Sequence, residues 1–518
     1  MKTLIPIRSN RINDKKLATR AKKSAIAPVT IKSGDGLLGR VNEIKANVEQ
    51  KLGKYRDKYI VIWDTNSLIN YFNESSKQGI IAIDTETDGL DPITNHIAGL
   101  CIYTPGQKGA YVPINHLSLI TQQRLPDQLC EEEVNKHLSE FLNDSKVDID
   151  MFNASFDIRV CRNQLKTKNI YCTWDGYLGM RLLNENELDN RLKDLHKKYV
   201  LNGKEDAFTF ESLFKGIPFT MIPIDTGYLY AARDPEITYE LCEYERQYLR
   251  PDHEREDMRN VYWVFKNIEM PCVPVVADME DAGVLFDFDY NSQLQDKYHK
   301  ILNEREDNFH KVCDKYSDKI DAYRKKMGDN CKLDNPISID SPTQLAILLY
   351  DVLGYEGIID KKTKKMSRST DEEALKHLNN ELSKAILAYR ELSTIVGTFI
   401  DALPNSVNPK DGRIHCHFNQ YGAKTGRFSS SDPNLQNIPS HNKDIRKMFK
   451  ATDDEFVVNM MDNKICVDRW DEIVTESGWV CANNIKVGDM IETDCDGESM
   501  FESVKGKELI DNQIYFTI

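Results

Sequence analysis

Ile80-Ile81-Ala82-Ile83-Asp84-Thr85-Glu86-Thr87-Asp88-Gly89-Leu90 is the stretch that decides the fold of the first half of the chain. Its apolar run predicts a buried strand, and Asp88-Gly89 predicts the turn that ends this strand. Because side chains alternate along a strand, Asp84 and Glu86 leave the same face. Two neighbouring carboxylates repel and are costly to bury unless a cation lies between them, and hard oxygen ligands suit magnesium or manganese. The stretch alone also fits a strand end whose acids face water.

Length and composition predict an intracellular protein of two to four domains, with 518 residues and twelve cysteines that show no CxxC spacing. We expect a cytoplasmic location and no membrane partner, because no apolar run approaches the length of a bilayer span and no signal peptide is evident. The net charge of −14 is uneven: residues 1–40 hold ten Lys or Arg and two Asp, whereas residues 466–518 hold twelve acids and four bases. Residues 1–45 are therefore predicted to form a basic, flexible tail, which either contacts nucleic acid or is simply solvated.

Several patterned segments surround the acidic strand and together predict an α/β domain with a mixed sheet. Helical spacing covers residues 41–55 and 129–142, and apolar runs typical of strands cover residues 59–63, 97–103 and 109–114.

Two further acidic positions follow later in the same region. An apolar stretch delivers Asp157 at a predicted helix start, and Tyr230 and Asp234 are four residues apart, so on one helix they share a face. Either feature alone is as easily a surface contact. In this order, however, Asp-x-Glu, Asn-x3-Asp and Tyr-x3-Asp resemble the DEDD-type 3′–5′ exonucleases that have a tyrosine in the third motif.

That resemblance implies a ribonuclease H-like domain over residues 46–245. It further implies two divalent ions, Mg²⁺ or Mn²⁺, held by four carboxylates: one ion activates water and the other stabilises the leaving 3′ oxygen. Tyr230 would orient the attacking water. The implied catalytic residues that bind metal are Asp84, Glu86, Asp157 and Asp234. Tyr230 is the further catalytic residue and binds no metal.

The region from residue 246 to 465 begins with patterns that fit any helical domain. An amphipathic helix is predicted over residues 269–284 with its end at Gly283, and Thr370 with Glu373 predicts a capping box before a helical run from residue 374 to 403. Residues 425–439, Thr-Gly-Arg-Phe-Ser-Ser-Ser-Asp-Pro-Asn-Leu-Gln-Asn-Ile-Pro, are more specific. They are similar, with their flanks at 409–415 and 444–449, to a signature of family A DNA polymerases. The resemblance implies an α-rich thumb and the start of an α+β palm.

The signature also implies contacts with DNA and nucleotide. Arg427 would test base-pair geometry through minor-groove acceptors, Asn434 and Gln436 would bond the template-primer, and Arg446 would contact the incoming triphosphate. Asp462 aligns with the palm aspartate that holds catalytic Mg²⁺. After Ile465 the family pattern stops, so the second metal-binding aspartate and the nucleotide-gripping helix are missing and the polymerase site is interrupted.

Residues from Cys466 onward resemble the amino-terminal part of an intein, with a leading cysteine, a short hairpin that ends in Gly-Trp, and a later Ile-x-Val-Gly-Asp. This implies that the Cys466 thiol attacks the Ile465 carbonyl to form a thioester. The family's Thr-x-x-His element and its carboxyl-terminal Asn-Cys/Ser junction do not occur here, and no histidine follows His441. We therefore expect a small β-rich fragment, 466–518, of a split intein or of a contiguous one. An unrelated β-rich tail is the alternative.

Three functions remain open at this stage. The first is the amino-terminal part of a proofreading DNA polymerase, in phage-type replication in a bacterial cell or in repair. It would act on single-stranded 3′ ends and primer-template, and trans-splicing with a complementary intein–polymerase polypeptide would complete it. The second is a stand-alone 3′–5′ exonuclease with a non-functional polymerase remnant. The third is a chain whose main role is as a partner-binding splicing precursor.

Overall fold

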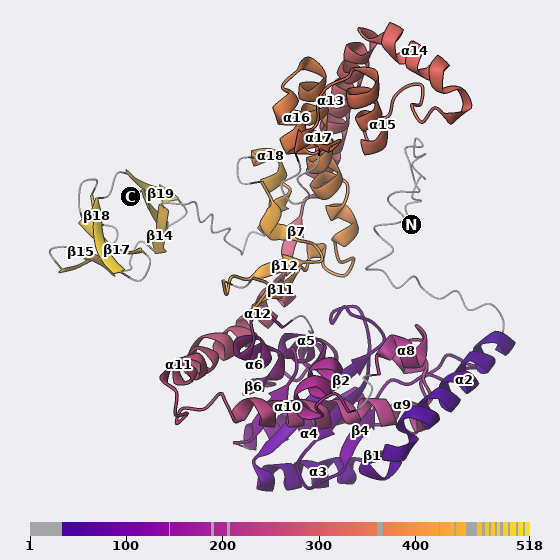
Figure 1. The fold of residues 1–518 in the computed structure, drawn as a ribbon. Coiled ribbons are helices and arrows are strands. Elements are labelled where there is room, and N and C mark those ends of the chain that lie inside the picture. Colours follow the sequence, from indigo (N-terminus) through magenta and orange to yellow (C-terminus); the bar gives the residue numbers. More distant parts are fainter. Residues whose placement is uncertain are drawn as a thin grey trace, which may run out of the picture. The chain divides into compact units, whose positions relative to one another are not determined.

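A computed structural model of the chain divides into two compact units, residues 1–446 and 447–518 (Figure 1). The division lies at Arg446/Lys447. The residues that the structure describes are 34–144, 146–187, 191–204, 208–359, 366–423, 425–439, 442–451, 464–468, 472–475, 478–481, 484–486, 490–495, 498–503, 506–510 and 513–517.

The first part of the chain is built on a six-stranded mixed sheet in the order β1-β4-β3-β2-β5-β6. The acidic strand β2 is central: it pairs antiparallel with β3 and parallel with β5. The predicted α/β domain with a mixed sheet is therefore confirmed. The six strands are β1 (Tyr59–Val61), β2 (Ile80–Thr87), β3 (Ile97–Tyr103), β4 (Gly109–Pro113), β5 (Asp148–Met151) and β6 (Trp174–Asp175).

Both faces of this sheet are buried. Ile81 and Ile83 of β2 belong to one apolar cluster, whereas Cys101 and Tyr111 of the neighbouring strands belong to a second cluster on the other face. Because side chains alternate, Asp84 and Glu86 point away from Ile81 and Ile83. The helices of this part are α2 (Gly34–Leu52), α3 (Thr65–Gln78), α4 (Glu131–Asp144), α5 (Ala154–Val160), α6 (Gly176–Leu183), α7 (Leu192–Leu195), α8 (Phe210–Phe214), α9 (Ile224–Ala231) and α10 (Arg233–Arg246).

Helix α2 corrects the predicted extent of the basic tail. It begins at Gly34, and its Val41 and Ile44 side chains are buried in the second apolar cluster. Residues 34–45 are therefore part of the folded domain, because this helix buries an apolar stripe that the charge count of the first forty residues concealed. Residues 1–33 lie outside the described residues.

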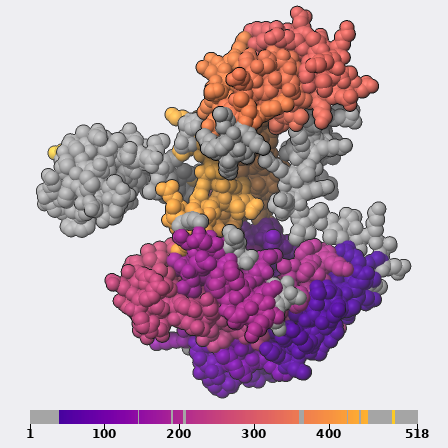
Figure 2. All heavy atoms as spheres, in the orientation of Figure 1, coloured from indigo at the N-terminus to yellow at the C-terminus, as the bar shows by residue number. Residues whose placement is uncertain are grey.

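A helical region follows, whose core is formed mainly by the long helix α13 and by α17, drawn salmon to orange in Figure 1. Figure 2 shows the salmon-to-orange atoms of these helices gathered in one mass. Its helices are α13 (Phe288–Asp314), α14 (Ser317–Met327), α15 (Pro342–Ala346), α16 (Glu372–Leu378) and α17 (Glu381–Ile395), with a short hairpin β8 (Ile358–Ile359) and β9 (Met366–Ser367). The preceding helices α11 (Glu256–Val264) and α12 (Met270–Ala282) pack instead in the first apolar cluster of the sheet. Helix α12 ends at Gly283 as predicted.

The predicted capping box of Thr370 and Glu373 is wrong. The Asp371 side chain caps α16 by accepting a hydrogen bond from the Ala374 backbone N–H at 2.8 Å. The Thr370 hydroxyl instead accepts a hydrogen bond from Arg390. The predicted continuous run also breaks after Leu378, where Asn380 and Ser383 form a capping box that starts α17.

The elements that carry the polymerase-like signature are short. Strands β7 (Val284–Phe286) and β10 (Arg413–Ile414) pair antiparallel, as do β11 (His417–Asn419) and β12 (Ser429–Ser431), followed by the helix α18 (Lys443–Arg446).

The described residues of the second unit are mostly in strands, with a few turn and irregular positions and one isolated helical residue at 484. They form a sheet β14-β20-β19 and a sheet β16-β15-β17-β18. The strands of these two sheets are β14 (Lys464–Asp468), β15 (Glu472–Thr475), β16 (Gly478–Cys481), β17 (Met490–Cys495), β18 (Glu498–Ser503), β19 (Gly506–Ile510) and β20 (Gln513–Thr517), and the short strand β13 (Phe449–Lys450) belongs to neither sheet. Among the helices that the structure describes, none has the length and apolar composition to cross a membrane.

Candidate active site

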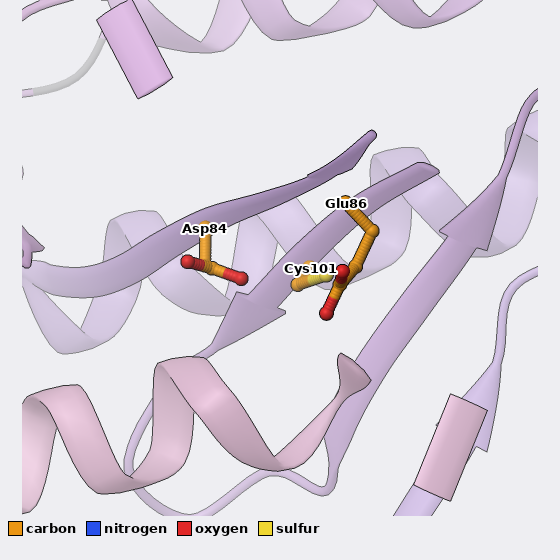
Figure 3. Close-up of side chains that lie close together, drawn as sticks. All are labelled: Asp84, Glu86 and Cys101. Carbon is orange, nitrogen blue, oxygen red and sulfur yellow. The ribbon is translucent and has the colours of Figure 1, made fainter. Parts of the chain in front are cut away.

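The acidic pair of β2 lies side by side on the sheet face that packs toward α9 and α10. Oxygens of Asp84 and Glu86 and the sulfur of Cys101, which is paired with Asp84 across the strands, all lie within 4.8 Å of one another (Figure 3). Burial and then Asp84 raise the pKa of the Cys101 thiol, so the thiol stays neutral. A neutral thiol is a poor ligand for a hard cation, so the two carboxylates are the groups of this trio that could hold a metal ion.

Asp157 reaches the site from the first turn of α5. The buried Asp175 carboxylate accepts hydrogen bonds from the backbone N–H groups of Asn153 (3.0 Å) and Ala154 (2.8 Å) and so fixes the start of this helix. Oδ1 of Asp157 then accepts bonds from the backbone N–H of Thr85 at 2.9 Å and from its hydroxyl at 2.6 Å. These bonds join the helix to β2 beside the acidic pair, as the sequence order predicted.

Asp234 and Tyr230 come from two successive helices and not from the single helix that their spacing suggested. Tyr230 is in α9 and Asp234 in α10, and the two helices meet at Ala232. Asp234 Oδ2 accepts a hydrogen bond from Lys193 Nζ at 2.6 Å. Its Oδ1 atom is buried and has no hydrogen-bond partner among the described residues.

The four acids interact electrostatically. Burial is the largest cause that raises the pKa of Asp84 well above its ordinary value, and Asp157, Asp234 and Glu86 raise it further. Burial, and then the charge of Asp234, raise the pKa of Glu86 in the same way. Burial also raises the pKa of Asp157 to about 7, although the bonds from Thr85 oppose it. Four mutually repelling carboxylates with one orphan oxygen form a donor set that fits divalent cations.

Tyr230 is enclosed by aromatic rings. Its ring lies 5.2 Å from that of Phe214, nearly perpendicular, and 6.3 Å from those of Phe210 and Phe219. Burial raises the pKa of its hydroxyl, so the phenol remains protonated at neutral pH. It can therefore donate a hydrogen bond at a fixed position.

Sequence reasoning missed three side chains of this site: Lys193, Thr85 and Asp175. Thr85 lies inside the quoted stretch, where its hydroxyl was a visible candidate partner for an acid. Lys193 and Asp175 carry no comparable signal, because each acts through an element that is distant in sequence.

The residues of the polymerase-like signature are exposed, in contrast to the acids. Arg427 lies in the connection between β11 and β12, and Gln436 lies in a short 3₁₀ turn, Leu435–Asn437. Asn434 caps that turn by accepting a hydrogen bond from the Gln436 backbone N–H at 3.1 Å. Arg446 ends α18. The structure describes no contact that joins all four, and Asp462 lies outside the described residues.

Cys466 lies in β14, where it pairs with Tyr515 of β20. Strand β14 begins at Lys464, so it includes the Ile465–Cys466 peptide bond at which the intein resemblance begins.

The sequence matches known proteins in two segments. Residues 59–249 match the family described as 3'-5' exonuclease, and residues 306–464 match DNA polymerase family A. The two matches show a 3′–5′ exonuclease segment followed by a DNA polymerase family A segment, and the chain is thus an enzyme related to both families.

Relatives cover most of this chain, but the chain covers less than half of each relative. DNA polymerase I of Chloroflexus aurantiacus is 29% identical over 405 residues, 76% of this chain and 39% of the relative. The enzyme of Pseudomonas aeruginosa is 29% identical over 428 residues (80% and 43%), and that of Synechocystis sp. is 30% identical over 388 residues (73% and 36%). The chain therefore spans about two fifths of the length of these curated relatives.

One solved structure shares the fold. The POL domain of Pol1 from M. smegmatis, in complex with DNA primer-template and dNTP, has a TM-score of 0.52 and 22% sequence identity, covering 75% of this chain and 57% of that one.

Proposed function

We propose that the exonuclease domain removes nucleotides from the 3′ end of single-stranded DNA by two-metal phosphodiester hydrolysis. The observation that supports this most is the convergence of four carboxylates from β2, α5 and α10, with Asp234 Oδ1 buried and unpartnered among the described residues. Magnesium or manganese, when bound there, would activate water and stabilise the leaving 3′ oxygen.

Individual side chains of the site would have separate roles in this reaction. Asp84, Glu86 and Asp234 would hold the cations, and Asp157 would complete the set from a position fixed by Thr85. The protonated Tyr230 hydroxyl would orient the attacking water, because its ring is held by three phenylalanines.

A labelled oligonucleotide tests this function directly. With magnesium, a single strand labelled at its 5′ end should shorten one nucleotide at a time from the 3′ end, and a circular single strand should remain intact. Cleavage of the circle, or digestion that begins at the 5′ end, would contradict the proposal.

We further infer that residues 246–465 supply a thumb and the first part of a polymerase palm that binds primer-template, so that the exonuclease proofreads. The match to DNA polymerase family A and the exposure of Arg427, Asn434, Gln436 and Arg446 support this. Asp462 would contribute to the Mg²⁺ site of the completed polymerase. Because its substrate is DNA, we infer that the protein works inside the cell.

The polymerase would be completed by trans-splicing through Cys466. The strand-rich composition of the second unit supports a β-rich intein fragment. Mixing this chain with a polypeptide that carries a histidine-containing intein remainder, then the missing palm and fingers, should give a ligated product with polymerase activity. Cys466→Ala should give none. Absence of ligation by the unaltered chain would favour the alternative, a stand-alone exonuclease with a non-functional polymerase remnant.

A further inference from the structure

Lys193 lies beside the four acids and contacts Asp234, although it belongs to no motif. It extends from the short helix α7 and places Nζ 2.6 Å from Asp234 Oδ2 and 3.9 Å from the centre of the Tyr230 ring. Its side chain is 15% exposed, and that of Asp234 is 10% exposed. The ammonium thus contacts both members of the Tyr-x3-Asp motif.

The charge of Lys193 acts on the whole cluster. It opposes the rise in pKa of both Asp84 and Glu86, which means that it stabilises their ionised forms. Removing one partner from a buried ion pair leaves an uncompensated charge, and here the remaining groups are four acids that already repel one another. A buried ammonium therefore does part of the electrostatic work that a metal ion would do.

The contact also occupies an atom that a metal ion would use. Of the two oxygens of Asp234, Oδ2 accepts from Lys193, while Oδ1 is buried and unpartnered among the described residues. One oxygen of the Asp234 carboxylate is thus bonded to the ammonium, and the other oxygen accepts no hydrogen bond from the described residues.

The backbone that carries Lys193 is anchored close by. His196, three residues later, places Nε2 2.6 Å from Oε2 of Glu240 on α10, the helix that also carries Asp234. A lysine has a flexible four-carbon stem, so its ammonium can leave Asp234 by a change of rotamer while the α7 backbone stays in place.

We propose that Lys193 is a tethered cation that holds Asp234 in place when no metal is bound and yields Oδ2 as a divalent ion enters, so that it sets the metal affinity of the exonuclease site. The proposal rests on the proposed two-metal function. It assigns Lys193 as a positioning residue and not as a metal ligand. The competing interpretation is a structural lysine that only joins α7 to α10.

The test compares Lys193→Met with Lys198→Met. Lys198 pairs with the buried Glu187 at 2.8 Å, so the control also removes an ion pair in the same segment, but away from the four acids. Binding of manganese alone is measured by calorimetry and by electron paramagnetic resonance, and the melting temperature is measured at pH 8 in chelator and in saturating manganese.

We expect Lys193→Met to bind manganese about tenfold more tightly than the unaltered protein, to melt at a lower temperature in chelator, and to regain its stability in manganese. If the variant is unfolded in chelator, manganese should refold it. Lys198→Met should lose stability equally in both conditions and keep its manganese affinity. Lys193→Arg, which retains the charge, should bind manganese no more tightly than the unaltered protein.

Unchanged or weaker manganese binding by Lys193→Met would overturn the tethered-cation role while leaving the two-metal function intact. A Lys193→Met protein that stays unfolded in manganese would also overturn it, because the lysine would then be structural. If the unaltered protein binds no manganese at all, the proposed two-metal function fails and the role of Lys193 fails with it.

Discussion

The acidic site and the polymerase-like signature of this chain place their polar side chains in opposite environments. The residues Asp157, Asp234 and Glu86 are 3%, 7% and 9% exposed and come from three separate elements, α5, α10 and β2. Arg427 and Arg446 are exposed, and each lies on a turn or a helix of a few residues.

This difference has an energetic meaning. The buried acids are costly in the folded protein, so their positions must be enforced by packing and by specific donors such as Thr85. The exposed residues cost little without a ligand, and in the proposed function they become ordered by DNA. In the proposed function, the protein therefore positions the acids before DNA binds, and the exposed residues of the signature become ordered when DNA binds.

The largest effect should come from Asp84→Ala combined with Glu86→Ala. We expect the exonuclease rate on a single strand to fall by at least about a thousandfold, equivalent to about 4 kcal/mol, because two ligands of the cations are lost. The melting temperature in chelator should rise, since two mutually repelling buried acids are removed. Gel assays and thermal melts check both outcomes. Retention of the activity would show that the site is assigned to the wrong residues.

The second effect concerns the connection between the two regions. Arg159, two residues after Asp157, is buried and donates to Glu280 Oε2 at 2.8 Å and to Asp281 Oδ1 at 2.7 Å. Glu280, only 1% exposed, also accepts from the Phe418 backbone N–H at 2.6 Å, next to the signature. Arg159→Met should lower the free energy of unfolding by roughly 3 kcal/mol, because it removes the permanently charged guanidinium that faces Oε2 of the buried Glu280.

Arg162→Met is the matched control for this change. Arg162 pairs with Asp278, whose side chain is 69% exposed, so its loss should cost less than about 1 kcal/mol in denaturant unfolding. If both variants lose the same free energy of unfolding, the buried Arg159–Glu280 pair stabilises the connection no more than the exposed Arg162–Asp278 pair does.

The sequence predicted the parts of the exonuclease site that depend on local geometry. Strand alternation placed Asp84 and Glu86 together, and a helix start placed Asp157. Motif order, in turn, brought Asp234 into the same set. Lys193 could not be found in this way, because a lysine on a four-residue helix is ordinary until α7 packs beside α10.

Local rules also failed where two of them competed. Thr370 and Glu373 fit the capping-box pattern, yet Asp371 caps the helix and Arg390 takes the Thr370 hydroxyl. The spacing of Tyr230 and Asp234 suggested one helix, whereas the chain divides at Ala232. In the first case a neighbouring residue is the cap and Arg390 binds the predicted one, and in the second Pro235 has no backbone N–H with which to continue helix α9.

A smaller effect should separate DNA binding from exonuclease chemistry. Arg427→Ala should weaken binding of primer-template about tenfold in fluorescence anisotropy and leave digestion of a single strand unchanged, because Arg427 lies outside the acidic site. Arg255→Ala removes another exposed arginine, one paired with Asp257, and should leave binding unchanged. If both variants weaken binding equally, the signature contributes only general positive charge.

The smallest effect is a pH dependence at the same connection. Glu280 Oε1 lies 2.8 Å from His417 Nδ1, and this hydrogen bond is the largest cause that raises the pKa of His417; burial and Arg159 oppose it, and Asp432 adds to it. A raised pKa in the folded state means that the stabilisation is complete below the ordinary histidine pKa of about 6.5 and is lost as the pH rises through the raised value. Because the His417 side chain is 42% exposed, the loss should stay below about 1 kcal/mol.

In denaturant unfolding from pH 6 to 9, His417→Gln should reduce the slope of stability against pH relative to the unaltered protein. An identical slope in the two proteins would show that His417 keeps one protonation state throughout, and that the buried Arg159–Glu280 pair alone carries the charge of this connection.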